Sequence, residues 1–169
     1  LPSSAKITKG EILFKENNIL KLNNEKIQKI RGNKISTIFQ EPMTSLNPLH
    51  TINKQIEEII LTHNKVSKIE AINKTIKLLK EVGLEEIANR PKTYSYELSG
   101  GQRQRAMIAM SIANNPDLLI ADEPTTALDV TIQKQILDLL DKLRKKYKMS
   151  LLLITHDLGI VKKIADRVC

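Results

Sequence analysis

The sequence contains a single cysteine, Cys169, among its 169 residues. One thiol cannot form a disulfide framework within the chain, and it cannot supply the several ligands of a cysteine-rich zinc site. Long hydrophobic runs are also absent. The two strongest, Leu118–Ala121 and Leu151–Ile154, are about five-fold shorter than a bilayer-spanning helix requires. The first residues do not have the pattern of a signal peptide, so we expect a protein of the cytosol.

The chain has more basic than acidic residues, but the basic residues are spread along the sequence. Lys and Arg number 27 against 19 Asp and Glu, which gives a net charge of +8 without a basic tail or block. Such a distribution is weak evidence for nucleic-acid binding. Hydrophobic residues make up 41% and charged residues 27%, the balance of a globular protein, and the length fits about one domain.

The first part of the chain, residues 1–40, predicts short strands around one small helix. The segments 10–14 and 34–39 carry the β-branched and aromatic residues that strands favour. We expect a turn at Asn17-Asn18 and a helix capped by Asn24.

Residues 41–115 predict a lobe made of helices. Apolar residues recur at helical spacing on two successive faces, and a third helix is expected between Leu98 and Asn114. The two faces consist of Ile52, Ile56, Ile59 and Ile60, and of Ile69, Ile72, Ile76 and Leu79.

The last part, residues 116–169, alternates between apolar strands and amphipathic helices. Leu118–Ala121 and Leu151–Ile154 are apolar at every position, which predicts parallel strands buried on both faces. We therefore predict an α/β fold in which a mostly parallel sheet carries an inserted helical lobe. The predicted divisions are residues 1–40, 41–115 and 116–169.

Polar side chains follow both apolar runs. Asp122 and Glu123 come directly after the first run, and His156 comes shortly after the second. The carboxyl ends of parallel strands meet at one edge of a sheet, where ligands bind. An acid pair there suits a Mg²⁺–phosphate site, and the imidazole can donate to a phosphate oxygen. The alternative is that the acids only form a turn and that the histidine is only solvated.

The segment LSGGQRQR, Leu98 to Arg105, precedes a good helix. Ser99, Gly100 and Gly101 would place successive backbone N–H groups around one anion at the positive end of that helix. The alternative is an ordinary helix cap, because a Ser-Gly pair is common before helices.

Taken in order, these motifs resemble the ATP-binding-cassette (ABC) ATPases. Gln40 follows an apolar strand, LSGGQ opens a helix, LLIADEP comes 16 residues later, and a histidine follows the next strand. The resemblance implies a P-loop NTPase-like core that binds ATP and Mg²⁺. It implies that Gln40 and Asp122 contact the metal, that Glu123 is the general base, and that His156 contacts the γ-phosphate.

The same resemblance implies a head-to-tail dimer. The signature motif would be Leu98–Gln102, in which Ser99, Gly100, Gly101 and Gln102 contact the nucleotide of a second cassette. The D-loop would be Ala127–Asp129, with Asp129 also at the nucleotide.

Two longer segments are similar to the oligopeptide, dipeptide and nickel importer branch of that family. They are IFQEPMTSLNPLHT at 38–51 and ADEPTTALDVTIQ at 121–133. Within that branch, the sequence most resembles the double-cassette ATPases of microcin C and peptide importers. This implies a peripheral protein on the cytoplasmic face of the inner membrane. Its expected partners are transmembrane permease subunits, contacted by Gln40 and the loop Pro42–Pro48, and indirectly a substrate-binding protein.

None of the six glycines belongs to a P-loop, Gly-x-x-x-x-Gly-Lys-Ser/Thr. The chain begins at Leu1 rather than Met, so we expect a partial cassette whose P-loop precedes it, with Leu1–Ser4 just after the P-loop helix. We expect the isolated piece to be inactive. One alternative is a catalytically inactive remnant of such a subunit. Another is an ABC-type ATPase acting on DNA, which the ordinary helices of the lobe and the single cysteine disfavour; no nucleic-acid partner is expected.

Overall fold

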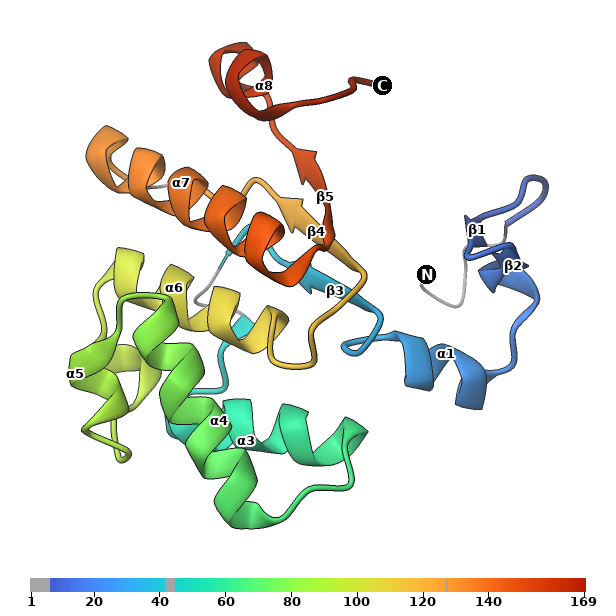
Figure 1. Cartoon of the computed structure of the whole chain (residues 1–169). Helices are drawn as coiled ribbons and strands as arrows, with labels where there is room; N and C mark the ends of the chain where they lie inside the picture. The colour runs from blue at the N-terminus through green and yellow to red at the C-terminus, as the bar shows by residue number, and fades with distance from the viewer. Residues whose placement is uncertain (1–6, 42–44, 127) are drawn as a thin grey trace.

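A three-stranded parallel sheet forms the centre of the computed structural model, which describes residues 7–41, 45–126 and 128–169 (Figure 1). Its strands are β3 (Ile35–Ile38), β4 (Leu118–Asp122) and β5 (Ser150–Ile154), in the order β3-β4-β5. In the register, Ile35 pairs with Leu118 and Leu118 with Ser150. The predicted α/β class with a parallel sheet is confirmed.

A group of helices lies between β3 and β4 in the sequence. It contains α3 (Ile52–His63), α4 (Lys68–Glu81), the short α5 (Glu85–Ala88), a 3-10 turn η2 (Ser95–Glu97) and α6 (Gly100–Ser111). Local signals in the sequence set where the helices begin. Thr51 caps α3, and Ser67 with Glu70 forms a capping box on α4.

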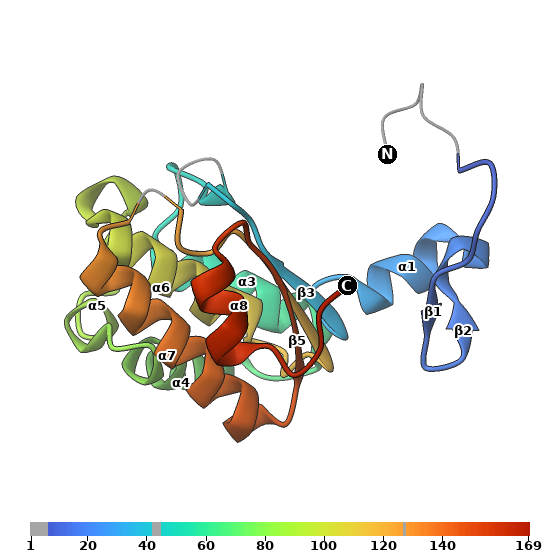
Figure 2. The same ribbon diagram turned by 90° about the horizontal axis from the view of Figure 1, so that it is seen from above.

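The helices α6 and α7 (Val130–Tyr147) lie on one side of the sheet, and α8 (Leu158–Ile164) follows β5 (Figures 1 and 2). One hydrophobic cluster joins the sheet, α7 and the inserted helices. Members from each part are Ile38 of β3, Ile56 of α3, Ile108 of α6, Leu119 of β4 and Leu140 of α7. The helical lobe and the sheet therefore share a core.

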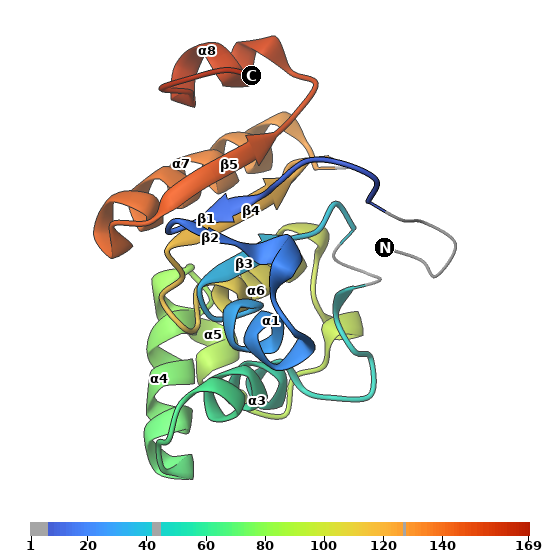
Figure 3. The same cartoon turned by 90° about the vertical axis from the view of Figure 1, so that its right-hand side faces the viewer.

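An arm of residues at the amino-terminal end projects away from these helices, and Figure 3 shows it in front of the sheet. It spans residues 7–30 and contains β1 (Leu13–Phe14), β2 (Asn17–Asn18), the 3-10 turn η1 (Ile19–Lys21) and α1 (Asn24–Ile30).

Two predictions about the arm were wrong in detail. Asn17-Asn18 is a strand rather than a turn; the turn is at Lys15 and Glu16, which adopt positive φ angles of 47° and 64°. The residue that caps α1 is Asn23, not Asn24, because the Asn23 side chain accepts a hydrogen bond from the backbone N–H of Lys26.

Burial also departs from the prediction at two places. Leu152 and Ile154 of β5 are about half exposed, whereas Leu151 and Leu153 pack on the core. The strand is therefore covered on one face, the face against the helices, rather than on both. On α4, Ile69 is 71% exposed, because the buried face is formed by Ala71, Thr75, Leu78 and Leu79.

Candidate active site

The three strands of the sheet end at one edge, as the prediction of parallel strands required. Gln40 lies just beyond β3, Glu123 follows β4, and His156 lies just beyond β5. The backbone N–H of Glu123 donates to the carbonyl of Ile154, at 2.9 Å, which ties the end of β4 to the end of β5. The sheet thus brings together side chains that are far apart in the sequence.

The carboxylate of Glu123 is the centre of this cluster. Its Oε2 accepts hydrogen bonds from the Gln40 side-chain amide at 2.9 Å and from the Thr126 hydroxyl at 2.8 Å. Its Oε1 lies 3.0 Å from Nδ1 of His156. Both carboxylate oxygens are engaged. Glu123 itself has a φ of 44°, a left-handed conformation that is uncommon for a residue other than glycine.

The contact between Glu123 and His156 shifts both pKa values in the directions of an ion pair. The hydrogen bond from His156, followed by that from Thr126, lowers the pKa of Glu123 below its ordinary value. The hydrogen bond to Glu123 and the charge of that carboxylate raise the pKa of His156. The imidazole is therefore charged over a wider pH range than a free histidine.

We expect the Glu123→Gln change to lower the pKa of His156. A neutral amide removes the negative charge that stabilises the imidazolium, so the ring should lose its proton at a lower pH. An NMR pH titration of the histidine ring resonances in the parent and the variant measures this. Equal midpoints for His156 in the two proteins would show that the contact does not form in solution.

Asp122 and Gln40 offer oxygen donors for a metal ion at this edge. Asp122 is the last residue of β4 and is partly exposed. Gln40 uses its amide nitrogen on Glu123, which leaves its amide oxygen for a cation. Carboxylate, amide oxygen and water are the ligands of Mg²⁺, which often takes only one or two protein groups and completes its shell with water and phosphate. The two side chains fit such an ion.

Ser99 is the N-cap of α6, and it forms a capping box with Gln102. The Ser99 hydroxyl accepts from the backbone N–H of Gln102 at 3.3 Å, and the Gln102 side chain accepts from the backbone N–H of Ser99 at 2.9 Å. The helix-cap interpretation is therefore realised here. The role of Gln102 in the cap was missed from the sequence, although the Ser-x-x-Gln spacing indicates it.

The two glycines of the same segment pack against the start of α7. A Cβ atom on Gly100 would lie 3.6 Å from a methyl of Leu128, an ordinary contact, and a Cβ atom on Gly101 would lie 3.0 Å from a methyl of Ile132. Asp129 caps α7 by accepting from the backbone N–H of Ile132. The predicted signature segment and the Asp129 end of the predicted D-loop therefore adjoin one another; Ala127 lies outside the described residues.

The Gly101→Ala variant should be less stable than Gly100→Ala by about 1 kcal/mol, because Ile132 must shift to admit the methyl group. At Gly100, the first residue of α6, the methyl group would lie at an ordinary contact distance from Leu128 and requires no shift. Urea unfolding of the two variants against the parent chain measures both effects. Equal stability of the variants would contradict the close contact between α6 and α7.

Arg105 joins the helical lobe to α7, and sequence reasoning missed it. Its guanidinium donates to the carbonyl of Val82 at 2.8 Å and to the side chain of Gln135 at 3.0 Å. Glu81 makes a second connection, to Tyr147 and Lys146 near the end of α7. Contacts between residues so far apart in the sequence leave no local pattern that could predict them.

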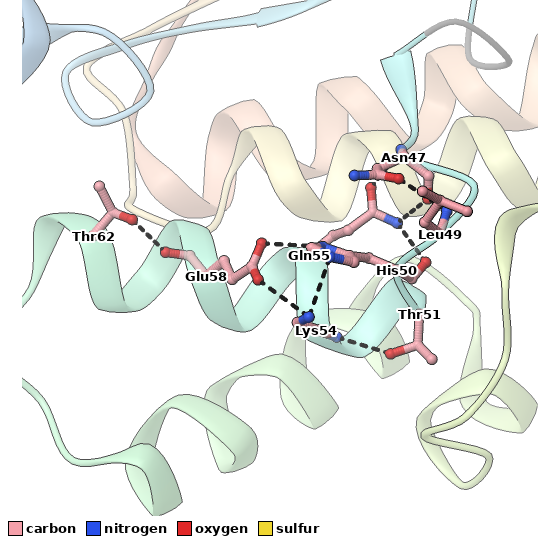
Figure 4. A network of polar contacts seen from close by, with 8 residues as sticks. All are labelled: Asn47, Leu49, His50, Thr51, Lys54, Gln55, Glu58 and Thr62. Atoms are coloured by element: carbon pink, nitrogen blue, oxygen red, sulfur yellow. Dashed lines mark hydrogen bonds and ion pairs between the residues drawn. The ribbon is translucent and has the colours of Figure 1, made fainter.

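Residues 47–50, just before α3, are held to that helix by a network of polar contacts (Figure 4). The buried Gln55 side chain accepts from the backbone N–H of Asn47 and donates to the carbonyls of Asn47 and His50. Lys54 and Glu58 contact the His50 ring on the outer side of α3. Leu49 is 81% exposed next to this network. Residues 42–44 of the predicted loop Pro42–Pro48 lie outside the described residues.

A family model described as ABC transporter matches residues 2–126 of the sequence, about three quarters of its length. The chain belongs to the ABC transporter family. Over 160 residues it is 59% identical to the peptidoglycan transport ATP-binding protein YejF of Agrobacterium fabrum, covering 95% of this chain and 29% of that protein. It is 50% identical over 167 residues to the dipeptide transport ATP-binding protein DppD of Bacillus subtilis, covering 99% of this chain and 50% of that one.

A solved structure of an ABC cassette has the same fold. The ATP-binding cassette MJ0796, described as dimeric, in a post-hydrolysis state and bound to ADP and Pi, superposes with a TM-score of 0.78 at 33% identity. The alignment covers 90% of this chain and 65% of that one. The ABC chain described here thus spans about a third to a half of the curated relatives' length. In the part that the structure describes, every helix is too short or too polar to cross a membrane.

Proposed function

We propose that this chain contributes the catalytic carboxylate of an ATP-hydrolysing site. The observation that carries the proposal is the convergence of Gln40 and His156 on Glu123 at the edge where three parallel strands end. ABC transporter chains bind ATP, and the neighbouring cassette structure holds ADP and Pi. The fold and the chemistry at the strand ends support the same reaction.

The roles of the side chains follow from their functional groups. Glu123, held as a carboxylate by its neighbours, accepts a proton from the attacking water, which makes that water a stronger nucleophile. His156 as an imidazolium donates to an oxygen of the γ-phosphate, where negative charge increases. Asp122 and the amide oxygen of Gln40 hold Mg²⁺, which neutralises phosphate charge when it is bound.

His156 weakens Glu123 as a base in this structure. Its Nδ1 lies on Oε1 of Glu123, and a hydrogen bond from a charged imidazolium makes that oxygen a poorer proton acceptor for water. A γ-phosphate near the imidazolium offers a competing acceptor with more negative charge. We infer that bound nucleotide draws His156 away and frees Oε1 for the water.

The signature segment Ser99–Gln102 and Asp129 serve the nucleotide of a second cassette. They form the adjoining amino-terminal ends of α6 and α7, where backbone N–H groups favour an anion. The cassette structures similar to this chain are described as dimeric, which supports pairing of two cassettes.

The transported substrate is a peptide or a peptide-like solute, imported through permease subunits to which this chain binds at the cytoplasmic face of the membrane. Support comes from the relatives, whose names specify dipeptide, oligopeptide and peptidoglycan transport. Residues 47–50, fixed to α3 by Gln55, present the exposed apolar side chain of Leu49 to the permease.

Uptake into proteoliposomes tests this function. The longest natural chain that contains this sequence would be reconstituted with its permease and substrate-binding protein, and supplied with ATP and Mg²⁺ inside the vesicle. We expect accumulation of labelled di- or oligopeptides that requires ATP and is lost in Glu123→Gln. ATP hydrolysis without any peptide uptake would overturn the substrate class, and the absence of hydrolysis would identify an inactive remnant.

A further inference from the structure

The three hydrogen-bond partners of Glu123 have different origins. Gln40 and His156 lie 83 and 33 residues away and belong to the ends of other strands. Thr126 is only three residues away, in the same turn, and its backbone N–H donates to the carbonyl of Glu123 at 3.1 Å. A movement of β3 or β5 relative to β4 would change the first two contacts but not the third.

The partners also divide the two oxygens between them. The Thr126 hydroxyl holds Oε2 at 2.8 Å, while Oε1 faces His156. If His156 departs, Oε1 becomes free, and the bond from Thr126 still fixes the rotation of the carboxylate. A carboxylate held at one oxygen presents the other in a defined direction, which is what a base acting on a positioned water requires.

The environment of Thr126 indicates that its hydroxyl has little role in stabilising the fold. The side chain is exposed, whereas that of the preceding Thr125 is buried. An exposed hydroxyl contributes little to the stability of the fold, because water can replace its hydrogen bond. The left-handed φ of Glu123 means that the direction of this side chain depends on the turn that Thr126 closes.

We propose that Thr126 is a positioning residue: its hydroxyl holds Oε2 of Glu123, so that Oε1 points at the water attacking the γ-phosphate. The inference rests on the proposed function, in which Glu123 is the base. Thr126 acts only through Glu123 and does not itself touch nucleotide in this scheme.

The test uses the full-length protein in its assembled transporter and compares Thr126→Val with Thr126→Ser. Valine keeps the branched shape and removes the hydroxyl, whereas serine keeps the hydroxyl. We expect Thr126→Val to lower kcat for ATP hydrolysis about ten-fold, as the loss of one hydrogen bond to a charged group would. The KM for ATP and the midpoint of thermal unfolding should stay unchanged, and Thr126→Ser should retain most of the parent kcat.

Thr8→Val, an exposed threonine of the amino-terminal arm, is the matched control and should leave kcat unchanged. In a Glu123→Gln background, Thr126→Val should not lower the residual rate further, because the group it positions is gone. A parent-like kcat for Thr126→Val, an equal loss in Thr126→Ser, or a further loss in the double variant would each overturn the inference. Full activity of Glu123→Gln would overturn the proposed function itself, and the inference with it.

Discussion

Glu123→Gln should lower ATP hydrolysis by a factor of about 10² to 10⁴ while ATP binding persists. The amide has the size of the carboxylate and can still contact Gln40 and Thr126, but it cannot accept a proton from water. Because the substitution leaves the proposed metal ligand Asp122 unchanged, nucleotide affinity should remain. Phosphate release and binding of a fluorescent ATP analogue, measured on the full-length protein, separate the two effects.

Glu11→Gln makes the same chemical change at an exposed position of the amino-terminal arm. It should hydrolyse ATP at the parent rate. If Glu123→Gln keeps more than a tenth of the parent rate, the base is another group, and the cluster at the strand ends needs a different explanation.

Ile108→Ala should lower the free energy of unfolding by about 2–5 kcal/mol. Ile108 is fully buried in α6, and its cluster includes residues of the sheet and of the helical lobe. Removing its outer carbons leaves a cavity in this shared core. Because the lobe and the sheet share that core, the loss should appear in one cooperative transition rather than in a separate unfolding of the lobe. Urea unfolding followed by circular dichroism measures both.

Ile69→Ala is the matched control for this variant. Ile69 is 71% exposed on α4, so the same substitution should cost less than about 1 kcal/mol. Two separate transitions in the parent chain, or similar losses for the two isoleucine variants, would contradict a core shared between lobe and sheet.

The sequence was most informative where local chemistry decides the structure. Ser99 before two glycines predicted the start of α6, and the apolar runs Leu118–Ala121 and Leu151–Ile154 predicted the strands β4 and β5. Since parallel strands end at one edge, the meeting of Glu123 with His156 followed from topology. These features depend on residues close in sequence or on one general rule about sheets.

The sequence was least informative where packing decides the structure. The periodicity of α4 pointed to Ile69, but contacts with the neighbouring helices rotate the buried face to Ala71 and Thr75. The bond from Thr126 to Glu123 depends on the left-handed conformation of Glu123, which no residue type in the segment signals. Arg105 donates to Val82 and to Gln135, which belong to two other segments and approach it only in the folded chain.

A structure of the ATP-bound dimer is the most direct test of the account. It would use the full-length Glu123→Gln protein with ATP and Mg²⁺. We predict that Gln40, Asp122 and His156 surround the γ-phosphate of one nucleotide, with His156 moved away from residue 123. The segment Ser99–Gln102 of the same chain should contact the other nucleotide. The account would be contradicted if both groups of residues met one nucleotide, or if the γ-phosphate lay away from the ends of β3, β4 and β5.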